Sequence, residues 1–174
     1  MTLNISHTFD EGNFRHYMNG FNVVLHCHHY MSLTTKLAID FDDIGGTRIL
    51  AESAEDSVLP ILIDYIQKNK LNDPQERLRI GAEFYKEMGL GQMTVSGNVG
   101  QGQVKLDSSH VEKGWIAKWG KTDGPVNHFT RGYIAAVFEA AFDKPARSYD
   151  IKETKSIVTG APATTFTIEK KQRG

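Results

Sequence analysis

The spacing of apolar residues switches between two periods along this chain, and the order of the switches restricts the fold. One apolar residue every three to four positions, typical of amphipathic helices, occurs in five segments: 30–44, 47–68, 73–89, 109–120 and 126–142. Alternation with a period of two occurs in two pairs of segments, 93–96 with 103–107 and 147–157 with 164–170. No strand–helix–strand repeat appears. We therefore predict an α/β (α+β) fold, a single domain over residues 1–174, with an antiparallel sheet packed against about five helices.

Local signals indicate where these segments begin and end. Asp73 before Pro74 is typical of a helix N-terminus, and Ser109 with Glu112 makes a capping box. Asn19–Gly20 separates two short apolar runs and predicts a two-residue hairpin loop. Pro60 lies inside a helical segment and should kink or divide it. We expect residues 1–12 to form a loosely held leader and residues 170–174 a frayed tail.

Two of the helical segments carry long apolar stripes. The stripe of segment 126–142 should be the most buried in the protein. Its members are Phe129, Tyr133, Val137 and Ala141; the stripe of segment 30–44 consists of Tyr30, Leu33, Leu37, Phe41 and Ile44. Long stripes on several helices offer more nonpolar surface than one sheet can cover, so we predict a homodimer.

Three histidines and the only cysteine of the chain occupy four consecutive positions, residues 26–29, after an apolar run. If the run stays extended, His26 and His28 share one face, and Cys27 and His29 share the other. If a helix has already begun, His26 and His29 share a face and Tyr30 lies above His26. The extended arrangement is the better half-site for a metal ion.

We hypothesise that this cluster binds a transition metal, iron or zinc, or the iron of haem. Imidazole suits all of these metals, so the ligand type does not select one. The candidate metal ligands are His26, Cys27, His28, His29 and His110, and His128 or Glu153 could add a further ligand. The alternatives are catalysis without a metal and ordinary packing or capping by the histidines.

Composition limits the classes of function. The chain has 20 basic and 21 acidic residues, which argues against a strongly basic nucleic-acid surface. A single cysteine cannot form an internal disulfide, and no apolar run approaches about 18 residues. We therefore expect a cytoplasmic protein without a membrane span and without a nucleic-acid partner.

Three stretches resemble the 4-vinyl reductase domain family. They are residues 108–115 (SSHVEKGW), 125–136 (PVNHFTRGYIAA) and 153–160 (ETKSIVTG), the last followed by Phe166. The likeness covers about residues 75–170, and the hairpin and helices of residues 13–69 are expected to belong to the same domain. The resemblance implies a fold shared with TRAPP trafficking subunits and, more distantly, with haem-based nitric-oxide sensors.

The resemblance also bears on ligands. It implies a small apolar or tetrapyrrole-like ligand, and His128 and Tyr133, on the resembling helix, are the candidate cofactor contacts. Family members with a structural zinc have cysteines where this chain has Asn127, Ser156 and Thr164, and only Glu153 matches the acidic ligand. Because these replacements bind zinc poorly, we expect no zinc at that hairpin.

Three classes of function follow from these features. The first, which we favour, is a small-molecule or metal-binding protein whose helix-lined apolar pocket is bordered by the histidine cluster. The second is a metal- or haem-dependent enzyme, such as a reductase, that uses the same cluster. The third is an interaction module similar to the trafficking subunits, with a filled core.

Overall fold

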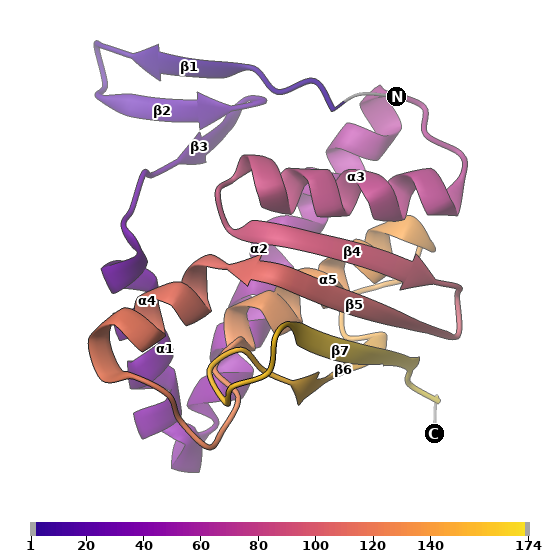
Figure 1. Cartoon of the computed structure of the whole chain (residues 1–174). Coiled ribbons are helices and arrows are strands. Elements are labelled where there is room, and N and C mark those ends of the chain that lie inside the picture. Colours follow the sequence, from indigo (N-terminus) through magenta and orange to yellow (C-terminus); the bar gives the residue numbers. More distant parts are fainter. Residues whose placement is uncertain (1–2, 173–174) are drawn as a thin grey trace.

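The structure, a computed structural model, describes residues 3–172 and is shown in Figure 1. Over these residues the chain forms a single α+β domain with five α-helices and antiparallel strand pairing, as predicted. The strands make two antiparallel sheets, where the sequence indicated one. The elements in order are β1 (His7–Asp10), β2 (Arg15–Met18), β3 (Phe21–Val23), α1 (His28–Asp40), the 3-10 turn η1 (Asp42–Ile44), α2 (Gly46–Lys68), α3 (Pro74–Glu87), β4 (Gly91–Gly97), β5 (Gln101–Ser109), α4 (His110–Trp119), α5 (His128–Ala141), β6 (Tyr149–Lys155) and β7 (Thr164–Lys170). Residues 1–2 of the predicted leader and 173–174 of the predicted tail lie outside this range.

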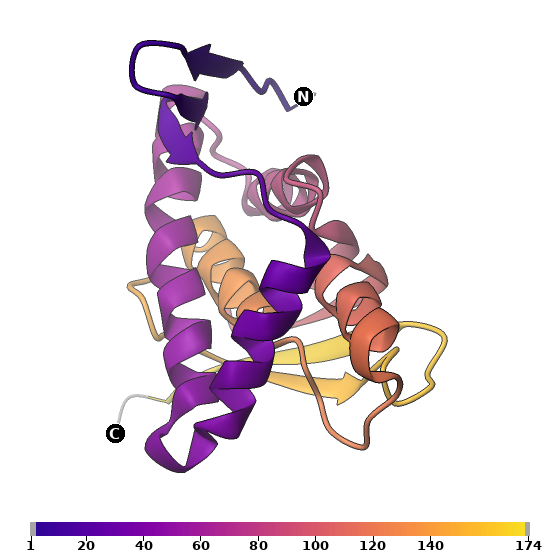
Figure 2. The same cartoon turned by 90° about the vertical axis from the view of Figure 1, so that its left-hand side faces the viewer.

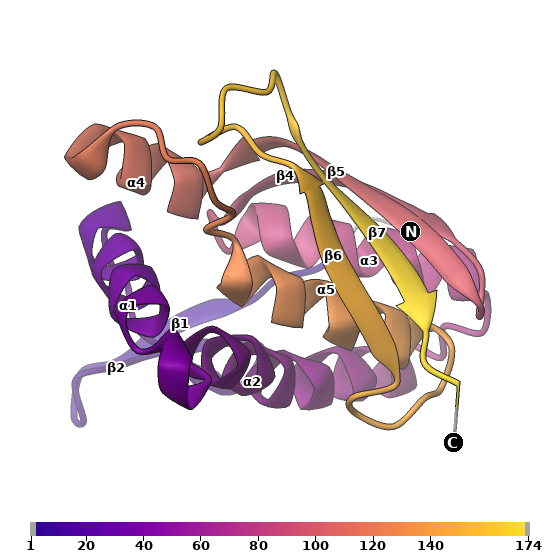
Figure 3. The same ribbon diagram turned by 90° about the horizontal axis from the view of Figure 1, so that it is seen from below.

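The larger sheet has the order β4-β5-β7-β6, and α5 lies between it and α2 (Figure 3). Twelve of the 14 residues of α5 are buried, as its apolar stripe predicted. The helices α2 and α5 approach closely at Gly132, where an added Cβ would lie 1.8 Å from the carbonyl oxygen of Ala51. Only glycine allows this approach, so a single position sets the distance between the two helices.

The predicted helix boundaries on either side of β4 and β5 are confirmed. Asp73 caps α3 by accepting a hydrogen bond from the Gln75 amide at 3.1 Å. Ser109 caps α4 by accepting from the Glu112 amide at 3.2 Å. Pro60 does not divide α2. It is exposed, so the carbonyl group that loses its helical partner can be hydrated instead.

The N-terminal residues form a separate three-stranded sheet, β1-β2-β3, away from the larger one (Figure 1). The two-residue hairpin at Asn19–Gly20 is confirmed: both residues have positive φ, and Met18 pairs with Phe21. The leader prediction was wrong, because β1 lies within it and pairs with β2. The Asn4 amide also donates to the Tyr65 hydroxyl at 3.2 Å, which connects this segment to α2.

The orientation of α1 differs from the usual rule for amphipathic helices, in which the apolar face points to the core. The buried residues of α1 are Met31, Ser32 and Thr35. The apolar stripe lies on the exposed side, with Tyr30 at 61%, Leu33 at 46%, Leu37 at 48%, Phe41 at 55% and Ile44 at 68% of their full exposure. The reason is the close packing of α1 on α4. A Cβ on Gly114 would lie 2.4 Å from the Ser32 hydroxyl and 2.8 Å from the His28 carbonyl oxygen.

No helix among the described residues is long and apolar enough to cross a membrane.

Candidate functional site

The histidine cluster lies at the start of α1 and not on a strand. The strand β3 ends at Val23, and Cys27 is the N-cap of α1 with an extended backbone (φ −85°, ψ 165°). The predicted sharing of a strand face by His26 and His28 was therefore wrong. The chain leaves the N-terminal sheet three residues before His26, so strand alternation does not apply to the cluster.

A histidine from another element joins the cluster. His110 is the first residue of α4, and α1 and α4 lie side by side with their N-termini at the same end (Figure 2). The ring centroid of His110 lies 5.6 Å from that of His26 and 6.1 Å from that of His28. The His29 ring is tilted against that of His28 with centroids 4.2 Å apart, and the Tyr30 ring lies 5.6 Å from that of His26.

Burial lowers the tendency of the His110 side chain to take up a proton. Desolvation lowers the pKa of His110, and the nearby His26 and His28 rings lower it further. Its Nε2 atom is buried and has no hydrogen-bond partner among the described residues. The exposed Cys27 thiol has a pKa below its usual value because the backbone amides of Tyr30 and His29 stabilise the thiolate.

The spacing of these rings is close to what a shared metal ion requires. Two imidazoles that bind one ion at about 2.1 Å have ring centroids roughly 5 Å apart. The separations of 5.6 and 6.1 Å around His110 exceed this value by about 0.6 and 1.1 Å. In the described part of the chain, no three His, Cys, Asp or Glu side chains already stand in ligand geometry. Binding would therefore require side-chain rotation of His26 and His28.

The cluster borders a small hydrophobic core between α1 and α4. The buried members of this core are Met31, Val111, Trp115, Val126 and Val158. Two further buried polar atoms on the same two helices have no partner within the described residues: Thr35 Oγ1 on α1 and Trp115 Nε1 on α4. We refer to this core together with the histidines as the α1–α4 layer. The sequence did not indicate that Thr35 and Trp115 would carry unpaired buried polar atoms, because both occupy ordinary positions in the predicted helices.

His128 and Tyr133, the candidate cofactor contacts, both lie on α5. His128 is the first residue of α5 and is only 8% exposed; burial, followed by the charge of Arg131, lowers its pKa to about 4. The Tyr133 side chain is fully buried, packs edge-to-face on Tyr85 at 4.9 Å and donates to the Gly81 carbonyl oxygen at 2.8 Å. The hydroxyl of Tyr133 is thus satisfied within the core.

The hairpin between β6 and β7 is organised around a carboxylate from α4. Glu112 is fully buried and accepts hydrogen bonds from the hydroxyls of Ser156 and Thr164, both at 2.7 Å. It also accepts from the backbone amides of residues 157 and 158 at 2.9 and 3.3 Å. The sequence predicted only a capping role for Glu112. Its second role depends on contacts more than 40 residues away.

Asn127 and Glu153 lie beside this network. Asn127 accepts a hydrogen bond from the Ser109 hydroxyl at 3.0 Å and donates through its backbone amide to Glu153 at 3.3 Å. Burial is the main reason that the pKa of Glu153 is raised. The four positions compared with the family's zinc ligands are therefore all engaged in hydrogen bonds that join the hairpin to α4 and to the start of α5.

Comparison with known proteins identifies the fold. No family model matches the sequence, and no curated protein matches it. The phenol-responsive sensory domain of the transcription activator PoxR, solved with phenol, is similar with a TM-score of 0.78 at 14% identity, over 94% of this chain and 84% of that chain. A trafficking protein particle complex subunit 3 from Naegleria fowleri, covalently bound to palmitic acid, is similar with a TM-score of 0.54 at 10% identity, over 83% and 95% of the two chains.

These likenesses confirm the predicted fold, which is similar to that of the trafficking subunit. Membership of the 4-vinyl reductase family stays a prediction.

Proposed function

We propose that this chain is a small-molecule-binding domain of the sensory type, with its site in the α1–α4 layer. A transition metal ion, bound by His26, His28 and His110, lies at one end of that site, at the N-termini of α1 and α4. The observation that supports this best is the buried His110 Nε2 atom, which has no partner within the described residues and lies next to two other imidazoles. An unsatisfied buried polar atom costs about 1–3 kcal/mol, which a bound ion or ligand group would recover.

The chemistry of the α1–α4 layer supports a ligand that is mostly apolar. Sites for small molecules are lined mainly by apolar side chains with a few polar groups that fix orientation. Met31, Val111 and Trp115 are buried apolar side chains of the layer, and Thr35 Oγ1 and Trp115 Nε1 are the unpaired polar atoms. Phenol, present in the similar PoxR domain, has this combination and is a suitable probe. A tetrapyrrole is the larger ligand consistent with the resemblance.

The metal is tested on protein purified without oxygen, by elemental analysis and by titration calorimetry with Zn²⁺ and Fe²⁺. We expect the double variant His28→Ala/His110→Ala to lose the bound metal while it stays folded. The matched control is His7→Ala/His16→Ala, which removes another histidine pair on the N-terminal sheet, whose His7 Nε2 and His16 Nδ1 atoms are already hydrogen-bonded to each other at 3.0 Å.

Metal content that survives in a folded His28→Ala/His110→Ala variant would contradict the metal site, and so would equal loss in the control. An absorption band of haem in the purified protein would identify iron in a tetrapyrrole instead of a free ion.

The ligand part is tested by titrating phenol and following thermal stability. The variant Trp115→Phe keeps an aromatic ring but removes the unpaired N–H, and we expect phenol affinity to fall about fivefold, as for one lost hydrogen bond. Trp119→Phe is the matched control, because Trp119 packs on Trp115 at 4.7 Å but its indole nitrogen is not one of the unpaired buried atoms. Phenol binding that is equal in wild type and Trp115→Phe would exclude this layer as the site.

We also propose that the exposed stripe of α1 is covered by a second copy of this chain. Side chains of this size at half exposure present on the order of 100 Å² each, so the five residues present on the order of 500 Å². That area is at the upper end of what a monomer leaves open. A single helix face of this kind is self-complementary, since two copies related by a two-fold axis bring the same stripe together.

A further inference from the structure

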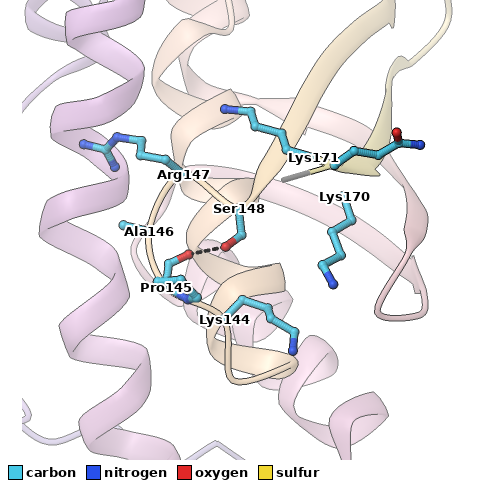
Figure 4. Close-up of a pocket in the computed structure, with 8 residues that line it drawn as sticks. Lys144, Pro145, Ala146, Arg147, Ser148, Lys170 and Lys171 are labelled. Atoms are coloured by element: carbon cyan, nitrogen blue, oxygen red, sulfur yellow. Dashed lines mark hydrogen bonds between the residues drawn. The ribbon is translucent and has the colours of Figure 1, made fainter. Parts of the chain in front are cut away.

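A pocket of about 680 Å³ lies where the loop between α5 and β6 faces the end of β7 (Figure 4). It lies apart from the α1–α4 layer, at the opposite end of α5. The side chains that line it include Lys144, Pro145, Ala146, Ser148, Lys170 and Lys171. Three of the eight lining residues are lysines, although the chain as a whole has a formal net charge of −1.

The fold brings the lysines together from two elements. Lys170 lies on the same face of β7 as Phe166 and Ile168, which are buried in the main core. Because α5 ends at Ala141, the face of β7 at Lys170 meets the loop instead of a helix. The side chains of Lys144 and Lys170 point to the same side of the loop in Figure 4.

The loop that forms one wall is held by buried carboxyl groups. The Ser148 amide donates to Glu139 at 2.9 Å, and the Arg147 amide donates to Glu55 at 2.6 Å. The Ser148 hydroxyl donates to the Pro145 carbonyl oxygen at 2.7 Å, and the Lys171 amide donates to the Ser148 carbonyl oxygen at 2.9 Å. These bonds fix the wall in place before any ligand arrives, which reduces the entropy cost of binding.

The charges around the pocket are unbalanced. The Arg147 guanidinium turns toward α2, where it pairs with Glu55 at 3.0 Å and Asp56 at 2.9 Å. Lys144, Lys170 and Lys171 form no ion pair within the described residues. Glu139, beneath the loop, has its pKa raised to about 8 by burial and by the neighbouring Glu55, so at neutral pH it is mostly uncharged. An anion in the pocket would therefore meet positive charge.

We propose that this pocket binds the phosphate group of a small organic phosphate, held by Lys144 and Lys170, whose side chains point to the same side of the loop. Lysine binds phosphate as a point charge without the fixed geometry that arginine requires. The volume lies within the usual range for small-molecule sites, about 300–1,000 Å³. Pro145, Ala146 and the alkyl stems of the lysines provide apolar surface for the organic part.

The probe is inorganic pyrophosphate, titrated into the full chain by calorimetry at low and at high NaCl. We expect the variant Lys144→Gln/Lys170→Gln to raise the dissociation constant at least tenfold, and wild-type affinity to fall as salt rises. The control Lys152→Gln/Lys155→Gln makes the same change of net charge with two exposed lysines of β6. It should stay within twofold of wild type.

Three results would overturn the proposal: no pyrophosphate binding by wild type at millimolar concentration, equal affinity in the pocket variant, or equal loss in the control. A phospholipid headgroup offers the same chemistry, so cosedimentation with phosphatidic acid vesicles provides a second measurement. We expect no sedimentation that depends on Lys144 and Lys170. Vesicle binding that these lysines control, without pyrophosphate binding, would reassign the pocket to a membrane surface.

Discussion

At the scale of single residues, Glu139 shows how the fold can hold an acid in its neutral form. The side chain lies on α5, is fully buried, and shares its surroundings with Glu55 of α2 and with Arg147. Desolvation is the largest cause of its raised pKa, and a hydrogen bond with Glu55 is the next. Two carboxyl groups in such contact cannot both ionise without a large cost.

This pKa predicts that stability falls as pH rises from 4.5 to about 8. Because the pKa of Glu139 rises from an ordinary 4.5 to about 8 in the folded state, folding takes up a proton between these values. The contribution of Glu139 is complete below pH 4.5 and is lost as pH rises through 8. At pH 7 the free energy of unfolding should fall by about 1 kcal/mol per pH unit from this group.

Urea unfolding between pH 7 and pH 9 measures the effect in a range where His128, whose pKa is lowered to about 4, stays neutral in the folded state. The variant Glu139→Gln keeps the shape of the side chain and should flatten the pH dependence. An unchanged slope in this variant would show that another group is responsible.

At the scale of elements, two glycines determine how the helices pack. Gly114 allows α4 to lie against α1, and Gly132 allows α5 to lie against α2. In both places a Cβ would meet backbone atoms, which cannot move aside as a flexible side chain can. The position of α1, and with it the outward direction of its apolar stripe, follows from the first of these contacts.

The α2–α5 contact predicts a large penalty for one added methyl group. A Cβ at position 132 would lie 1.8 Å from the Ala51 carbonyl oxygen, so Gly132→Ala must push the helices apart. We expect a loss of about 3 kcal/mol in the free energy of unfolding, the upper end of the range for overpacking. Thermal and urea unfolding measure it.

Gly124→Ala is the matched control, because a Cβ at position 124 meets nothing within 4 Å. Its stability should lie within about 0.5 kcal/mol of wild type. Equal stability of both variants would mean that α2 and α5 are farther apart than described.

At the scale of the whole molecule, apolar exposure is concentrated in the N-terminal part of the fold. Of the twelve large hydrophobic residues that are exposed in the described chain, ten lie between residues 9 and 49. The main core, built from α2, α3, α5 and the larger sheet, leaves few such residues open. The proposed dimer contact therefore falls on α1 and its flanking segments.

The double variant Leu33→Glu/Leu37→Glu tests this assembly. Both residues lie on the exposed stripe, so the change should leave the fold of the protomer intact and separate a dimer into monomers. Light scattering at micromolar concentration gives the mass. The control Ile63→Glu changes another exposed residue, 37% accessible, on α2 outside the stripe. A wild type that is monomeric would contradict the proposal directly.

The sequence by itself determined where most elements begin and end. Asp73, Ser109 and the Asn19–Gly20 loop act through hydrogen bonds and backbone preferences within a few residues, so their effects could be predicted without the fold. The burial of α5 could also be predicted, since it is apolar almost all round. The separation of β1 to β3 into their own sheet could not, because it depends on where the chain leaves the core.

Only the tertiary structure decided which distant groups meet. His110 joins His26 and His28 because α1 and α4 pack with their N-termini together, across more than 80 residues of chain. Glu112 reaches the β6–β7 hairpin for the same reason. Local patterns determine the conformation of a segment. The partner of a side chain depends on how close two backbones can approach, and at Gly114 that distance is set by the absence of a single Cβ atom.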